Sequence, residues 1–146
     1  MVCTVTYKLP VSVLVLVHSV DLQVLLLERA DRPGFWQSIT GSQDPGETLA
    51  ETASRELAEE TGLVAGPDML VDWKLKNEYE IYSHWRGRYA PGVTHNTEHV
   101  FGLTLPATQD VLLAPREHLA WRWLPLMEPT GSASPNSAFK CGPRIW

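Results

Sequence analysis

Residues 41–63 read GSQDPGETLAETASRELAEETGL, and this stretch decides the local fold around it. Its first six residues hold two glycines and a proline, which predicts a tight loop. Thr48, with Glu51 three positions later, forms a capping box, and Gly62 is a stop signal, so a helix is predicted over Thr48–Thr61. Apolar residues recur on it every four positions: Leu49, Ala53 and Leu57.

The predicted helix and the loop before it carry the negative charge of the chain. Residues 44–60 hold six acidic side chains and one base, a net of −5 that equals the formal charge of all 146 residues. At about 100° per residue, Glu56, Glu59 and Glu60 lie on one helix face. Their mutual repulsion is relieved by a divalent cation, and Mg²⁺ commonly joins carboxylates to substrate phosphates. Taken alone, these three residues fit a solvated acidic face equally well.

The spacing of these residues resembles the motif of the Nudix family. Gly41, Glu47 and the run 55–63 occupy every specified position of that motif. The resemblance implies the Nudix fold, of the α/β (α+β) class, which is an α/β/α sandwich around a mixed β-sheet. In that fold the motif forms a loop, a helix and a second loop. It also implies hydrolysis of a diphosphate linkage with Mg²⁺, or alternatively Mn²⁺, because metal ions neutralise phosphate oxygens and activate water.

The same resemblance implies roles for residues of the motif. Glu56 and Glu60 would be the principal metal ligands, and Glu59 would either hold a further metal ion or accept a proton from the attacking water. These three glutamates form the expected catalytic set. Three positions would support them: Gly41, Glu47 and Arg55. The last two of these would form an ion pair that orients the metal ligands.

Five further segments resemble one subgroup of the family, the bacterial pyrophosphohydrolases that act on dihydroneopterin triphosphate and are also described for dATP. The segments are 7–12, 35–42, 88–94, 96–98 and 117–121. The subgroup implies a metal ligand outside the motif at Glu117. It implies substrate contacts at Lys8, Arg29, Thr40, Tyr79, Glu80, Ile81, Tyr82 and Asn136.

Physical chemistry supports some of these implied contacts. Lys8 and Arg29 are cations suited to phosphate oxygens. Tyr79 and Tyr82 lie three apart on a predicted strand and so point to opposite faces, which leaves at most one of them to stack on a flat pterin ring. The chain departs from the subgroup at its end, because Ser134-Pro135-Asn136-Ser137 only loosely echoes the segment that carries Asn136, and no final helix is predicted.

The rest of the chain predicts a mixed sheet around the early helix. Strands are expected at Val11–Val17, Val24–Leu27, Phe35–Ile39, Met69–Lys76, Glu78–Ser83, Val100–Leu105 and Leu119–Leu124. Glycine and proline between Arg86 and Asn96 predict a long functional loop. We expect one Nudix hydrolase domain over residues 1–128 and an irregular tail over 129–146, where proline and glycine interrupt any periodicity.

Composition excludes several classes of partner. A pI near 5.5 argues against non-specific nucleic-acid binding. The longest apolar run, Val11–Val17, has seven residues, against the roughly 20 of a membrane span. Cys3 and Cys141 lie at opposite ends of the chain without metal-ligand spacing, which favours reduced thiols and a cytoplasmic protein. A monomer is favoured, although the sequence does not fix the oligomeric state.

Three functions remain open. The first is an acid-anhydride hydrolase of folate biosynthesis that converts dihydroneopterin triphosphate to its monophosphate and pyrophosphate. The second is a related hydrolase whose main substrate is dATP or another nucleoside triphosphate. The third is a Nudix-fold module that binds a nucleotide without cleaving it, and the presence of Glu56, Glu59 and Glu60 argues against it.

Overall fold

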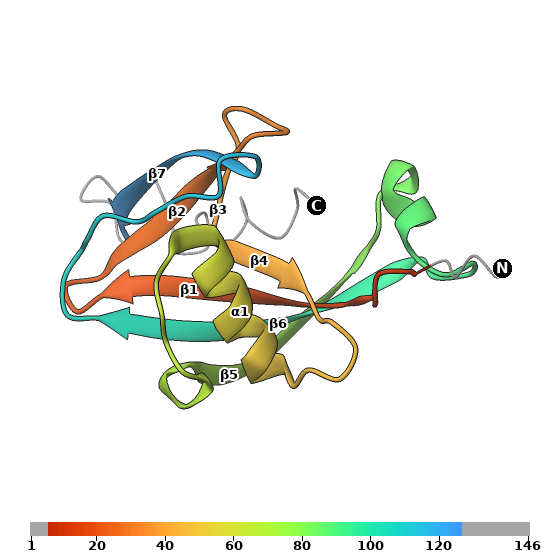
Figure 1. Ribbon diagram of the computed structural model, residues 1–146, viewed down its shortest axis with the longest axis horizontal. Coiled ribbons are helices and arrows are strands. Elements are labelled where there is room, and N and C mark those ends of the chain that lie inside the picture. The colour runs from red at the N-terminus through yellow and green to blue at the C-terminus, as the bar shows by residue number, and fades with distance from the viewer. Residues whose placement is uncertain (1–5, 127–146) are drawn as a thin grey trace, which may run out of the picture.

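Strand β1 (Val11–Ser19) lies inside a seven-stranded mixed sheet in the computed structural model, which describes residues 6–126 (Figure 1). The strand order is β3-β2-β1-β6-β5, with β4 paired to β1 and β7 paired to β2. β1 runs parallel to β6 and antiparallel to β2 and β4. The other elements are β2 (Gln23–Arg29), β3 (Trp36–Gln37), β4 (Ile39–Ser42), α1 (Leu49–Thr61), η1 (Pro67–Met69), β5 (Val71–Glu80), η2 (Ser83–Arg88), β6 (His95–Leu105) and β7 (His118–Pro125).

β1 is buried on both faces, as its continuous apolar run predicts. Val13, Val15 and Val17 face the cluster that receives α1, whereas Leu14 and Leu16 belong to a second cluster on the other face. The strand predicted at 11–17 is therefore confirmed, and the parallel pairing to β6 extends it to Ser19.

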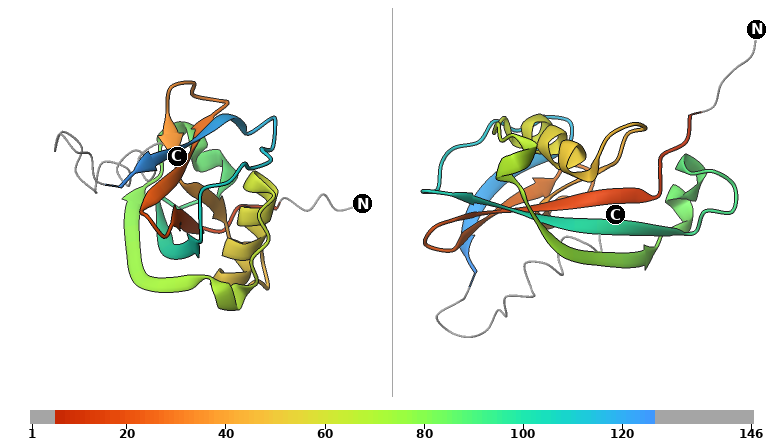
Figure 2. Two further views of the ribbon diagram at one scale, coloured as in Figure 1. Left: turned by 90° about the vertical axis from the view of Figure 1, so that its left-hand side faces the viewer. Right: turned by 90° about the horizontal axis from the view of Figure 1, so that it is seen from below.

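Helix α1 covers one face of the sheet (Figure 2). The predicted capping box between Thr48 and Glu51 is present, and Gly62 adopts the left-handed conformation, with φ 73°, that ends the helix. Ala53 and Leu57 are fully buried against the sheet, so the apolar stripe has the predicted role. Residues 6–126 contain this one α-helix, and the second helical layer implied by the family resemblance is not among them.

Several predicted strand boundaries are wrong. The strands predicted at 69–76 and 78–83 are one strand, β5, with an irregularity between Asp72 and Leu75. β5 is an edge strand with mostly exposed side chains, so its apolar pattern did not reveal its continuity. The single strand predicted at Phe35–Ile39 is instead two short strands, β3 and β4, and Phe35 belongs to neither. The two are separate because β3 pairs with β2, whereas β4 pairs with β1.

The loop predicted over 86–96 is shorter than expected. Its beginning belongs to the 3₁₀ helix η2, and β6 begins at His95 rather than at Val100, because the end of β5 pairs with residues 95–99. The predicted tail, Asn136 and both cysteines lie outside the described residues, so the domain boundary after residue 128 remains a proposal. Within residues 6–126, no helix has the length and apolar character needed to cross a bilayer.

Candidate active site

A cavity of about 420 Å³ lies beside α1 and is lined by residues of several strands of the sheet. Arg29 and His118 line it where β2 and β7 pair, and Ser12 lines it from β1. Tyr79 and Asn96 line it from β5 and β6, which lie on the other side of β1 from β2 in the strand order. Glu56 and Glu60 enter from α1. The sheet order therefore places two different groups of side chains at two ends of one cavity.

The β2–β7 end of the cavity holds a cluster of possible metal ligands. One donor atom each from Glu60, Glu117 and His118 lies within 4.8 Å of the other two. Glu60 is 3% exposed, and its Oε2 accepts a hydrogen bond of 3.2 Å from the amide of Thr40. Glu56 lines the same cavity one helical turn earlier. The structure thus brings together the three metal ligands predicted at 56, 60 and 117.

The electrostatics of this cluster disfavour its own negative charge. Burial raises the pKa of Glu60 well above its usual range, and the neighbouring Glu56 and Glu117 raise it further. Burial also raises the pKa of Glu56 to about 7, although Arg55 opposes this. Burial lowers the pKa of His118 to about 4. This imidazole is therefore neutral near pH 7, and its 3.6 Å approach to Glu60 is not an ion pair there.

This donor set fits a divalent cation. Three carboxylates supply the oxygen ligands that hard cations prefer, and a cation would favour the charged forms that burial disfavours. His118 is 4% exposed, and its Nδ1 has no hydrogen-bond partner in residues 6–126. An unpaired imidazole nitrogen beside the buried carboxylate of Glu60 is unfavourable in a site built for stability alone.

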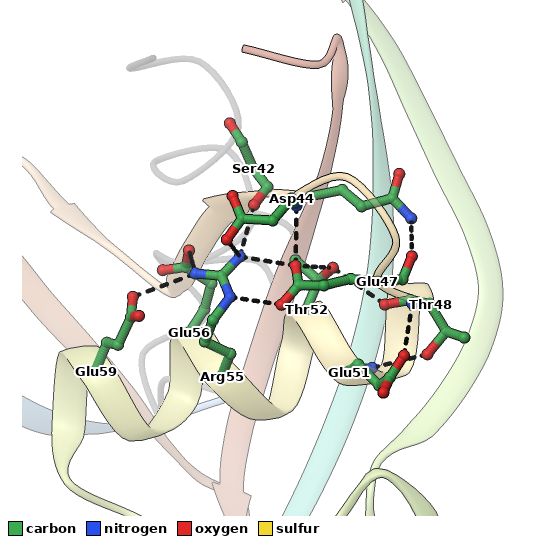
Figure 3. A network of polar contacts seen from close by, with 10 residues as sticks. Ser42, Asp44, Glu47, Thr48, Glu51, Thr52, Arg55, Glu56 and Glu59 are labelled. Carbon is green, nitrogen blue, oxygen red and sulfur yellow. Dashed lines mark hydrogen bonds and ion pairs between the residues drawn. The ribbon is translucent and has the colours of Figure 1, made fainter. Parts of the chain in front are cut away.

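Arg55 holds the ligand-bearing face of α1 and the preceding loop together (Figure 3). Its Nε and Nη2 donate to the two carboxylate oxygens of Glu47 at 2.7 and 2.9 Å. Its Nη1 donates to Glu56 at 2.7 Å and to Glu59 at 3.3 Å, and Nη2 also donates to the carbonyl of Ser42. The Arg55 guanidinium holds the pKa of Glu47 at about 2. The structure therefore contains the predicted Arg55–Glu47 ion pair. Arg55, held by Glu47, in turn orients the carboxylate of Glu56.

Gly41 gives the carboxylate of Glu56 its place. A Cβ at position 41 would lie 2.0 Å from Cδ of Glu56. Gly41→Ala is therefore expected to displace this carboxylate and to lower kcat at saturating Mg²⁺ by about 10- to 100-fold. The flexible glutamate can move aside, so the melting temperature should change by less than about 3 °C. A large loss of melting temperature with normal specific activity of the folded fraction would contradict this explanation.

The raised carboxylate pKa values predict how the stability of the metal-free protein depends on pH. Glu56 binds its proton more tightly in the folded state, so stability is lost as pH rises toward and through its folded pKa of about 7. His118 acts oppositely between its folded pKa of about 4 and its unfolded value of about 6.5. Above pH 6.5 His118 no longer contributes to the pH dependence. The two carboxylates then determine its sign, and Glu60 acts in the same direction as Glu56.

With EDTA, the melting temperature is therefore expected to fall by about 3 °C or more between pH 6.5 and 8. Saturating Mg²⁺ should reduce this fall, because the ion stabilises both carboxylates in their charged form. Differential scanning calorimetry across this pH range would measure both effects. A metal-free melting temperature that rises over the same interval would contradict the predicted sign.

The structure brings most of the predicted substrate residues to the cavity. Those that line it are Lys8, Arg29, Thr40, Tyr79 and Ile81. Glu80 and Tyr82 do not line it: Glu80 pairs with Arg86 at 3.2 Å, and the ring of Tyr82 stacks on His84. Tyr79 is therefore the one tyrosine of this pair that lines the cavity, and the predicted reason is wrong, because Tyr82 lies beyond the end of β5 and precedes η2 instead of lying on the same strand.

The remaining predicted residues lie away from the cavity surface. Glu47, Arg55 and Glu59 do not line it, and Glu59 is 55% exposed at its side chain. Its predicted role in catalysis therefore remains a prediction. Asn136 lies outside the described residues.

Sequence reasoning missed several residues of the cavity: Ser12, Asp31, Gln37, Trp85, Arg88, Tyr89, Asn96, Arg116 and His118. Asn96 is 1% exposed and donates hydrogen bonds to Ser12 Oγ at 2.8 Å and to Tyr79 OH at 3.0 Å. Six of the nine, at positions 12, 37, 88, 89, 96 and 118, fall in segments that carry the subgroup likeness. Pairing between distant strands is what brings them into one cavity.

Comparison with known proteins agrees with the motif and the geometry. The family model described as NUDIX domain matches residues 8–140. The chain is 49% identical over 121 residues to the dihydroneopterin triphosphate diphosphatase of Escherichia coli K12, covering 81% of this chain and 79% of that protein. It is 40% identical to the protein of the same name from Haemophilus influenzae, over 81% of this chain and 75% of that one.

A solved structure extends the likeness to three dimensions. The E. coli dihydroneopterin triphosphate pyrophosphohydrolase superposes with a TM-score of 0.72 at 47% sequence identity, covering 81% of this chain and 82% of that one. The mixed sheet with its helix is thus the α+β Nudix fold. The complete motif, the family match over most of the chain and the similarity to these relatives together show that the chain belongs to the Nudix family.

Proposed function

We propose that this chain is a divalent-metal-dependent pyrophosphohydrolase that converts dihydroneopterin triphosphate to dihydroneopterin monophosphate and pyrophosphate, a step of folate biosynthesis. The observation that carries the proposal is a single cavity lined by both carboxylate metal ligands and cations suited to phosphate. The substrate comes from the relatives, two of which are named for this activity at 49% and 40% identity.

The charges of the cavity suit a triphosphate bound together with metal. Four cations line it: Lys8, Arg29, Arg88 and Arg116. Burial and the nearby Arg88 lower the pKa of Lys8, so a phosphate beside it would favour its charged form. Guanidinium groups bind phosphate oxygens through paired hydrogen bonds. The cations and carboxylates that line the cavity thus match phosphate oxygens and metal ions respectively.

The other end of the cavity suits the organic part of the substrate. Asn96 donates its two amide protons to Ser12 and Tyr79, and Ser12 also hydrogen-bonds to Tyr79, so the proton of the Tyr79 hydroxyl remains available to a ligand. Burial raises the pKa of the Tyr79 phenol and keeps it protonated. A neutral hydroxyl donor and an aromatic ring are suited to a flat heterocycle with carbonyl and ring-nitrogen acceptors.

We propose Mg²⁺ as the metal. Mn²⁺ is the alternative, because it accepts a nitrogen ligand such as the nearby imidazole of His118 more readily than Mg²⁺ does. Glu56, Glu60 and Glu117 would hold the metal, which when bound supplies charge for the phosphate oxygens and acidifies water. Arg55 keeps Glu56 oriented, and Glu59, at the rim of the acidic face, remains the proposed second metal ligand or proton acceptor. The monomeric state and cytoplasmic location predicted from the sequence belong to the same proposal.

A panel of triphosphates tests this function. We expect kcat/KM for dihydroneopterin triphosphate to exceed the values for dATP, dGTP, ATP and GTP by at least about tenfold at saturating Mg²⁺. A nucleotide that exceeds the pterin tenfold would replace the folate assignment with nucleotide hydrolysis. Binding without turnover of any compound would favour the non-catalytic module instead.

A further inference from the structure

We propose that Trp85 and Asp31 are positioning residues for Arg29, which they hold from two sides so that one edge of its guanidinium faces the cavity. This inference rests on the proposed function, in which Arg29 binds a phosphate of the substrate. All three side chains line the cavity, and neither Trp85 nor Asp31 was predicted from the sequence.

Asp31 fixes the guanidinium of Arg29 along one edge. Nε donates to Oδ1 at 2.7 Å, and Nη2 donates to Oδ2 at 2.5 Å, which is the paired geometry of an arginine–carboxylate fork. The Arg29 side chain is only 13% exposed. Its Nη1 has no hydrogen-bond acceptor in the described part of the chain. The edge that carries Nη1 is therefore available to a phosphate.

Trp85 supports the same guanidinium from a different part of the fold. Cζ of Arg29 lies 5.6 Å from the centre of the indole ring, within the range of a cation–π contact. Arg29 ends β2, whereas Trp85 belongs to η2, the green segment between β5 and β6 in Figure 1, and β2 is separated from β6 by β1. The contact thus links two parts of the cavity lining that come from strands, or segments beside strands, that are not adjacent in the sheet.

The indole ring is itself held in place. It lies 4.8 Å from the ring of His84 and 5.5 Å, edge to face, from that of Tyr82. Arg88, a second cation of the cavity, also lies against it at 5.8 Å. An indole ring held by its neighbours in and beside η2 can set the position of the flexible Arg29 side chain. Asp31, which is 59% exposed, sets the rotation of the Arg29 guanidinium.

Two other arginine–aromatic contacts in the chain provide a comparison. Arg32 lies 4.2 Å from the ring of Phe35, and Arg122 lies 3.8 Å from that of Trp36. Both contacts are shorter than the one at Trp85, yet none of their four residues lines the cavity. An arginine–aromatic pair is therefore common on this surface, and the location at the cavity is what gives the Arg29–Trp85 pair a role in binding.

A double-mutant cycle between Trp85 and Arg29 tests the proposal, using the triphosphate that the panel shows to be preferred. Trp85→Ala is expected to raise KM about 3- to 10-fold with kcat within twofold. Trp85→Phe should keep KM within about twofold, because it retains an aromatic face. In the Arg29→Ala background, Trp85→Ala should change KM by less than about 1.5-fold. Phe35→Ala, which removes a matched ring outside the cavity, should leave KM within twofold.

The same cycle is then measured as the affinity for inorganic pyrophosphate with Mg²⁺, by calorimetry, which requires no turnover. We expect the same loss with Trp85→Ala, the same absence of a further loss in the Arg29→Ala background, and a comparable loss with Asp31→Asn. Equal effects of Trp85→Ala with and without Arg29, or no effect of Arg29→Ala on either measurement, would overturn the proposal. A nucleotide preference in the panel would overturn only the pterin assignment and leave this cycle interpretable.

Discussion

Replacing Glu60 with glutamine is expected to lower kcat about 1,000-fold or more at saturating Mg²⁺. The substitution keeps the shape of the side chain and removes one charge from the proposed metal ligands. A bound metal contributes several kcal/mol of charge stabilisation in the transition state, which corresponds to this range. Glu60 is 3% exposed and lies in the cluster with Glu117 and His118.

The fold should survive this substitution. Burial raises the pKa of Glu60 well above its usual range, so the metal-free protein already favours a neutral side chain there. We therefore expect the melting temperature of Glu60→Gln with EDTA to equal or exceed that of the wild type. Glu51→Gln is the matched control, since glutamine also serves in a capping box, and it should keep kcat within twofold. More than a tenth of wild-type activity in Glu60→Gln would refute the metal assignment.

Removing Arg55 is expected to lower kcat/KM about 10- to 100-fold, the usual effect of losing a residue that orients metal ligands. The guanidinium is the only donor to the Glu56 carboxylate in the described residues, and it also binds Glu47 and Ser42. Without it, the carboxylates of Glu47 and Glu56 lose their partner. The pKa of Glu56, which Arg55 now lowers, should rise above about 7 and weaken metal binding at neutral pH.

Two measurements separate this effect from general destabilisation. The Mg²⁺ concentration for half-maximal rate should increase at least about tenfold in Arg55→Ala, and the acidic limb of the pH–rate profile should move to higher pH. Arg55→Lys keeps the charge without the paired geometry and should recover only part of the loss. An unchanged Mg²⁺ requirement and pH profile would show that Arg55 does not act through Glu56.

The local part of the fold was predictable because its signals are local. Thr48, Glu51 and Gly62 define the ends of α1 through hydrogen bonds and backbone geometry within a few residues. The motif spacing around the same helix identified Glu56 and Glu60, which share one helix face. The structure adds the reason for Gly41, whose missing side chain leaves space for Glu56.

The part of the cavity that does not come from α1 could not be predicted, because it depends on contacts between residues far apart in the sequence. Asn96 meets Ser12, 84 positions away, because β6 runs parallel to β1, and Trp85 meets Arg29 through the 3₁₀ turn after an edge strand. β5 was predicted as two strands because its exposed side chains lack apolar alternation. Glu59 differs from its two helix neighbours, since a helical wheel groups it with Glu56 and Glu60 but it does not line the cavity, so its proposed role stays untested.

The central claim is that this cavity hydrolyses a diphosphate linkage of a pterin triphosphate with a divalent metal. Phosphorus NMR of the products formed from dihydroneopterin triphosphate with Mg²⁺ tests it most directly. We expect pyrophosphate and dihydroneopterin monophosphate in equal amounts, with no turnover in EDTA. Release of orthophosphate alone, turnover that persists in EDTA, or an intact triphosphate after prolonged incubation with Mg²⁺ would contradict the claim.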